Sequence, residues 1–182
     1  MKNGNQIVYR RITPPELTQK IFSRFIRRQK VTECLRPTPD GGWCVKEIAF
    51  TDDWSPDETA ALAAELRENA ESGGLVLGAF ADGFLKGFVS VSPLPFGSRR
   101  QYLDLVHIYV SEELRGNGIG RRLFSSAAVW AKQRGAEKLY ISAHSAVESQ
   151  SFYMALGCID TAEPEPAHIQ KEPCDRQLEY SL

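Results

Sequence analysis

The sequence lacks the features that mark several large protein classes. Its 182 residues carry 22 Lys and Arg against 23 Asp and Glu, so the formal net charge is only −1. Proteins that bind nucleic acid normally show a clear basic excess, so we expect no nucleic-acid partner. The longest apolar stretch, at 75–81, is far shorter than the ~20 residues that span a bilayer. The first residues also lack the apolar segment of a secretory signal, so we expect no membrane association.

Cysteine and histidine are few and scattered. The four cysteines form no Cys-x-x-Cys pair, and none of the three histidines has a spacing typical of a zinc site. We therefore expect no bound metal. We expect the cysteines to be free thiols in a reducing, cytoplasmic setting.

What remains is an ordinary globular composition, with 42% hydrophobic and 25% charged residues. A chain of this length buries roughly 70% of the surface of its unfolded state, so it can fold without a disulfide or a metal. We expect a single domain over residues 1–182.

The pattern of apolar residues and turn signals predicts a mixed α/β chain. Strands are expected at 6–12, 75–80, 84–92, 102–110 and 137–143, and 43–50 reads as a short strand or an extended arm. Helices are expected from Pro14 to about Ile26, from a capping box at Ser55 to about Ser72, from the turn at 111–120 to about Arg134, and from a capping box at Ser145 to Gly157. The tail suits two short strands separated by a Pro-rich loop.

The sharpest local feature is the glycine-rich turn Arg115–Gly120, between a strand and an amphipathic helix. Helix-initial N–H groups lack acceptors within the helix and lie at the positive end of its dipole, and glycines let the backbone approach an anion. Together with Arg115, Arg121 and Arg122, the turn predicts a pyrophosphate site. It fits neither a P-loop nor the GxGxxG dinucleotide fingerprint. A glycine-rich helix start with surface arginines is the plainer interpretation, and it stays open.

This turn resembles the central signature of the GNAT superfamily of acyl-CoA-dependent N-acetyltransferases. Arg115-x-x-Gly118-x-Gly120 matches every specified position of [R/Q]-x-x-G-x-[G/A], and Phe152-Tyr153-x-x-x-Gly157 resembles a second family motif. The similarity is strong over about 102–158, which would be the cofactor-binding heart. The resemblance implies a GNAT-like fold: a central, twisted, mostly antiparallel mixed sheet of six to seven strands, flanked by about four helices.

The resemblance also implies which residues hold acetyl-CoA. Backbone groups of the strand would pair with the pantetheine arm, the Val110 N–H would polarise the thioester carbonyl, and the loop would bind the pyrophosphate. Where the family often has an Asn, seven residues before the Tyr, this chain has Ala146, so a side-chain contact to the pantetheine arm is either missing or supplied by Ser142, His144 or Ser149. The complete expected set is Ile108, Tyr109, Val110, Arg115, Gly116, Asn117, Gly118, Ile119, Gly120, Arg121, Ser142, His144 and Ser149.

Transfer of an acetyl group to an amine needs an acid for the departing thiolate and a neutral amine. By the resemblance, Tyr153 is the acid. Asp104 and His107 are the candidate bases: Asp104 by its position in the family, and His107 by its intrinsic pKa near ~6.5. Strand alternation predicts that Asp104 shares a face with Ile108 and Val110 and that His107 lies on the opposite face. A water chain in place of a single base stays open.

The resulting prediction is an N-acetyltransferase that moves an acetyl group from acetyl-CoA to a primary amine of a small molecule or a peptide. A non-catalytic acyl-CoA-binding module is the main alternative, and an unrelated α/β protein with an anion-binding helix start is a third. Pairing into a homodimer is left open. The acceptor and the acyl-chain preference are not determined by the sequence.

Overall fold

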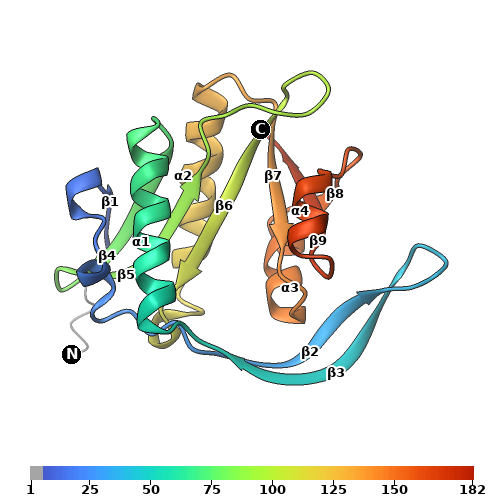
Figure 1. The fold of residues 1–182 in the computed structure, drawn as a ribbon, viewed down its shortest axis with the longest axis horizontal. Helices are drawn as coiled ribbons and strands as arrows, with labels where there is room; N and C mark the ends of the chain where they lie inside the picture. The colour runs from blue at the N-terminus through green and yellow to red at the C-terminus, as the bar shows by residue number, and fades with distance from the viewer. Residues whose placement is uncertain (1–5) are drawn as a thin grey trace.

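The structure, a computed structural model, describes residues 6–182; residues 1–5, where the expected domain begins, lie outside it. A seven-stranded sheet runs in the order β1-β4-β5-β6-β7-β9-β8 (Figure 1). Its strands are β1 (Val8–Arg11), β4 (Leu75–Ala81), β5 (Phe84–Val91), β6 (Tyr102–Val110), β7 (Lys138–Ala143), β8 (Ile159–Asp160) and β9 (Arg176–Ser181). Only the β6–β7 pairing is parallel. The expected mixed, mostly antiparallel sheet is confirmed.

Helices cover both faces of this sheet (Figure 1). Helix α1 (Pro56–Glu71) buries Leu62, Ala63 and Leu66 on one face, while α2 (Ile119–Gln133) and α3 (Val147–Ala155) pack on the other. The predicted capping box at α1 is confirmed, because Ser55 Oγ accepts from the Glu58 N–H and Glu58 Oε2 accepts from the Ser55 N–H. A fourth, short helix, α4 (Pro166–Lys171), lies in the Pro-rich part of the tail, where only a loop was expected.

The helix predicted after Pro14 is wrong. The segment forms two 3-10 turns, η1 (Pro14–Glu16) and η2 (Gln19–Phe22), separated by Thr18 in an extended conformation. Leu17 and Phe22 are nevertheless buried against α1 and the sheet. The apolar spacing therefore predicted burial only in part, since Ile26 is 45% exposed, and tertiary packing overrode the helical period.

A separate hairpin forms an arm that the sequence revealed only in part. It consists of β2 (Gln29–Pro37), which was not predicted, and β3 (Trp43–Asp52), expected as a strand or an arm. The hairpin runs from below α1 to α3 along one edge of the molecule (Figure 1). Cys34 is fully buried there against Val31, Ala146 and Ile48.

The arm also explains why the predicted capping box at Ser145 is wrong. The Leu35 N–H donates to the Ser145 carbonyl at 2.8 Å, and Cys34 forms a bridge with Ala146. This pairing holds Ala146 at φ −57° and ψ 134°, so α3 begins at Val147 with no side-chain cap. The Ser145 carbonyl therefore pairs with the arm, and the Ser145 side chain does not cap α3.

The feature that shapes the centre of the molecule is the parting of β6 from β7. The two strands pair only at Tyr102–Asp104 with Lys138–Tyr140. Beyond these three pairs, β6 continues along β5 and β7 continues along β9. A wedge therefore opens between β6 and β7 toward their C-terminal ends.

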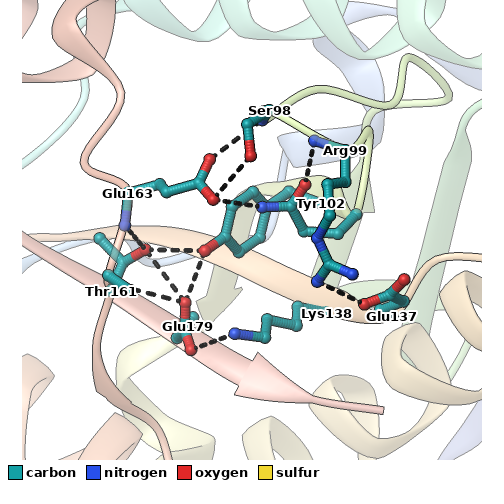
Figure 2. Close-up of polar contacts among 10 residues, drawn as sticks. Ser98, Arg99, Tyr102, Glu137, Lys138, Thr161, Glu163 and Glu179 are labelled. Carbon is teal, nitrogen blue, oxygen red and sulfur yellow. Dashed lines mark hydrogen bonds and ion pairs between the residues drawn. The ribbon is translucent and has the colours of Figure 1, made fainter.

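A buried ionic cluster joins β6, β7 and β9 at the closed end of the wedge, where β6 and β7 are still paired. Glu179 of β9, 4% exposed, accepts hydrogen bonds from Tyr102 Oη and Lys138 Nζ, each at 2.6 Å. Figure 2 shows the dashed contacts from Tyr102, Thr161 and Lys138 meeting on this carboxylate. Burial raises the pKa of Glu179, but these hydrogen bonds outweigh it and the pKa is lowered. The cluster joins β6, β7 and β9 where they are still paired.

We expect Lys138→Met to destabilise the fold by about 3 kcal/mol, because it leaves the buried Glu179 carboxylate without its cation. Arg99→Met is the matched control, since the Arg99–Glu137 pair is 67% and 56% exposed and its loss should cost less than about 1 kcal/mol. Urea unfolding at pH 7 measures both values. Equal effects would show that the Glu179 cluster does not hold the closed end together.

Candidate active site

Two cavities fill the wedge. The loop cavity, about 450 Å³, is lined by the glycine-rich turn and by the faces of β6 and α3. The tail cavity, about 490 Å³, is lined by β6, the end of β7, the arm and the segment 168–175. The two cavities share six lining residues: Arg27, Gln29, Ile108, Tyr109, Ser149 and Tyr153. They therefore meet in the middle of the wedge.

The glycine-rich turn has a backbone conformation that favours glycine and leaves open space beside it. Gly116 and Gly118 both have φ +78°, a conformation that favours glycine, and a Cβ at either would point into open space. Gly118 is the N-cap of α2, so the first N–H groups of the helix have no acceptor within it. At Gly120 a Cβ would lie 3.2 Å from the Phe152 ring, so glycine allows the close packing of α2 on α3.

Three polar side chains in and beside this turn contact other groups of the protein, and a fourth does not. Arg115 donates from Nε to the Val110 carbonyl at 3.0 Å and from Nη2 to the Arg27 carbonyl at 2.8 Å. Asn117 donates to the carbonyls of Leu114 and Arg115 and does not line the loop cavity. Arg122 lies 4.2 Å above the Tyr9 ring. Arg121 lines the loop cavity, and its side chain has no hydrogen-bond or ionic partner among residues 6–182.

Tyr153 lies where the two cavities meet. It is 8% exposed and packs against Phe124 and Phe152. Burial raises the pKa of its phenol, so the group stays protonated and can donate a proton. The Tyr153 hydroxyl makes no hydrogen bond to any residue that the structure describes.

The predicted faces of β6 are wrong, because a β-bulge interrupts the alternation. Leu105 pairs with Val91 and His107 with Ser90, so Val106 is the extra residue. Ile108 and Val110 consequently pack with Leu103 and Leu105 in the α2 core, and Asp104 does not share their face. Asp104 and His107 instead both line the tail cavity.

These two candidate bases have different partners. His107 Nε2 lies 3.1 Å from Glu65 Oε1 of α1 and, as an atom, is buried. The hydrogen bond with His107 lowers the pKa of Glu65. Asp104 Oδ2 lies 3.0 Å from His168 Nε2 of α4.

The three residues expected to replace the missing Asn are not equivalent. Ser142 Oγ donates to Asp175 Oδ2 at 3.3 Å and accepts from Gln177 Nε2 at 3.0 Å. His144 Nδ1 accepts from the Ala146 N–H. Both line the tail cavity and not the loop cavity, whereas Ser149 lines both.

Sequence reasoning missed several residues of the site. Arg27 is 7% exposed, lies 4.8 Å over the Tyr109 ring and pairs with Asp52 of the arm. No signal pointed to it, because its segment had no predicted role. His168 stacks on Tyr140 with ring centroids 5.3 Å apart, from a helix that was not predicted. Glu172 and Asp175 both line the tail cavity; from the sequence they could either attract a cationic amine or be solvated loop charges, and the second was favoured.

The tail cavity is acidic. Its lining carries the carboxylates of Asp52, Asp104, Glu172 and Asp175 against only two permanent cations, Arg27 and Lys171. Burial raises the pKa of Asp175, which marks a carboxylate without a strong ionic partner. Such a lining suits a cationic ligand. No group of three metal-binding side chains is found in residues 6–182, and no helix there is long and apolar enough to cross a membrane.

Solved structures share this fold over nearly the whole chain. A putative streptothricin acetyltransferase from Bacillus anthracis, in complex with acetyl coenzyme A, is 16% identical with a TM-score of 0.69, covering 97% of this chain and 98% of that one. A nourseothricin acetyltransferase is 22% identical with a TM-score of 0.64, covering 95% of both chains. The PaiA N-acetyltransferase from Thermoplasma acidophilum, in complex with coenzyme A, is 16% identical with a TM-score of 0.58, covering 97% of this chain and 99% of that one.

A comparison with curated protein sequences found no match. The sequence pattern of the acetyltransferase (GNAT) family, in contrast, matches residues 42–158, which include β6, the glycine-rich turn and α3. This match covers more than half of the chain and agrees with the fold. The chain therefore belongs to the GNAT family of acetyltransferases.

Proposed function

We propose that this enzyme transfers the acetyl group of acetyl-CoA directly to a primary amine on a cationic acceptor. One observation carries the proposal: the wedge between β6 and β7 joins the loop cavity, lined by the glycine-rich turn and Arg121, to an acidic tail cavity, and Tyr153 lies where they meet. Coenzyme A would enter from the loop side and the acceptor from the tail side.

The loop cavity supplies what a coenzyme A pyrophosphate needs. The first residues of α2, including Arg121, line this cavity, so helix-initial N–H groups and a guanidinium are available to an anion there. The complexes of two structural neighbours with acetyl coenzyme A and coenzyme A support this assignment. Ser149 is the remaining candidate for a side-chain contact with the pantetheine arm, because it alone of the three substitutes lines the loop cavity.

The parted edge of β6 supplies the contacts for the pantetheine arm and the thioester. The Ser111 N–H donates to the Lys86 carbonyl on the β5 side, so strand alternation directs the Val110 N–H to the opposite edge. That edge faces the wedge, because β7 has left β6 by this point. The Val110 N–H is thus placed to polarise the thioester carbonyl as negative charge develops on its oxygen.

The reaction forms one bond and breaks one. The neutral amine attacks the thioester carbon, a tetrahedral intermediate forms, and the C–S bond breaks as the Tyr153 hydroxyl protonates the sulfur. The nitrogen of the intermediate loses a proton, which balances the one that Tyr153 has given. Asp104 and His107 remain the candidates from the sequence for deprotonating the acceptor ammonium.

An acceptor screen tests this function. Wild-type enzyme with acetyl-CoA is assayed for free thiol against amino acids, polyamines, aminoglycosides, nourseothricin and lysine peptides. We expect thiol release above hydrolysis with cationic primary amines. If acetyl-CoA binds but no amine raises the rate above hydrolysis, the non-catalytic acyl-CoA-binding alternative replaces the proposal.

We expect Tyr153→Phe to lower kcat by about a hundredfold to ten-thousandfold, the usual contribution of a positioned acid. The change removes only the hydroxyl, and the ring packing against Phe124 and Phe152 is retained. The Kd for acetyl-CoA, measured by calorimetry, should stay nearly constant. An unchanged kcat would remove Tyr153 from the mechanism.

We expect Gly118→Glu to weaken acetyl-CoA binding by at least about tenfold, because a carboxylate would repel the pyrophosphate at the start of α2. Gly118→Asn is the matched control, since Asn tolerates the left-handed backbone at φ +78° and adds no charge. Calorimetry gives both Kd values. Equal affinity of the two variants would contradict the phosphate assignment.

A further inference from the structure

His168 and Asp104 form a pair that no family motif supplied. His168 Nε2 lies 3.0 Å from Asp104 Oδ2, and the imidazole stacks on the Tyr140 ring at an interplanar angle of 22°. The side chains are 27% and 16% exposed, so the pair is largely shielded and still reachable from the tail cavity that both residues line. The carboxylate and the ring stack therefore hold the imidazole in one orientation.

We propose that His168 accepts the proton of the acceptor ammonium and that Asp104 is its positioning residue. With Nε2 at 3.0 Å from the Asp104 carboxylate, the neutral imidazole that keeps its proton on Nε2 is the favoured form, and its lone pair is then on Nδ1. Nδ1 makes no hydrogen bond to the residues in the described range 6–182. The nitrogen that can act as a base is therefore the unengaged one, in a cavity whose acidic lining attracts an ammonium group.

The charges around His168 support this role. Its hydrogen bond with Asp104 raises the pKa of His168, although burial acts in the opposite direction. Glu165 raises the pKa further and Lys171 lowers it. The groups that face the imidazole are Asp104 on β6, Tyr140 on β7, Glu165 at the N-cap of α4, Lys171 at its last position, and Asp175 in the tail. A base with a raised pKa is better matched to an ammonium donor.

His107 is less suited to the same task. Its Nε2 atom is buried and faces the Glu65 carboxylate, so that nitrogen is not open to a substrate. His168 also has Nε2 beside a carboxylate and Nδ1 without a hydrogen bond in residues 6–182, but its side chain is more exposed, at 27% against 17% for His107. The two histidines therefore provide a matched comparison, on β6 and α4, within one cavity.

The proton balance closes without another reagent. The ammonium N–H bond breaks and its proton passes to His168 Nδ1, which leaves a neutral amine to attack the thioester. His168 then returns this proton to bulk water. The second nitrogen proton, lost from the tetrahedral intermediate, balances the one that moves from Tyr153 to the thiolate, so the products are the amide, the free thiol and one proton.

The test is the pH dependence of kcat/KM for the best amine from the acceptor screen, so the inference rests on the proposed function. In the wild type we expect kcat/KM to fall as the pH drops through the raised pKa of His168, above ~6.5, because the protonated imidazole cannot accept a proton. His168→Gln should lower kcat about a hundredfold or more and remove this acid limb. Asp104→Asn should move the limb to lower pH, because the carboxylate that raises the pKa is gone.

Further measurements separate this role from a structural one. Added imidazole should restore part of the activity of His168→Ala, and the Kd of His168→Gln for acetyl-CoA should match that of the wild type. An NMR titration of the His168 ring, which requires no turnover, should show the pKa falling from wild type to Asp104→Asn.

The outcomes that overturn the inference are distinct from failure of the proposed function. It is overturned if His168→Gln retains the wild-type rate and acid limb, if it loses acetyl-CoA binding, or if His107→Gln alone removes the limb. An unshifted His168 pKa in the titration also overturns it. A wild type that acetylates no amine overturns the proposed function together with this inference.

Discussion

The site depends on one constraint: β6 and β7 pair over three residues and then separate. The buried Glu179 cluster, with Tyr102 and Lys138, ties the strands at the closed end. Beyond it, each strand keeps its outer neighbour, so the sheet remains supported while its centre opens. A parallel pair that continued would satisfy its backbone groups internally and leave no edge for a ligand. The parting exposes the β6 edge and creates the two cavities.

The two sides of the wedge are built in different ways. The loop side is local, since the turn and the first residues of α2 follow directly after β6 in the chain. The tail side gathers Arg27, Asp52, Asp104 and the pair His168 and Asp175 from four separate segments of the chain. The first side presents backbone N–H groups at the start of α2, which any sequence with suitable glycines can present. The second uses side-chain charge, and so it is the side that can differ between enzymes of one fold.

The sequence predicted the local parts of the fold well. The capping box at Ser55 and the strand, turn and helix around Arg115–Gly120 are confirmed, because their signals lie within a few consecutive residues. The failures share a cause. The bulge at Val106, the extended Ala146 and the 3-10 turns after Pro14 are each imposed by a neighbour that lies far away in sequence. No periodicity within the segment records such a neighbour.

By itself, the sequence determined the family and the glycine-rich turn, since residue types at short spacing set the backbone conformation of the turn. It also supplied Tyr153 and Asp104, but not their surroundings. Only the tertiary structure decided that Asp104 pairs with His168, that the Arg115 side chain donates to the Val110 carbonyl, and that Glu172 and Asp175 line a cavity. The physical reason is that burial and charge pairing depend on which distant segments meet, and these set the protonation behaviour of each group.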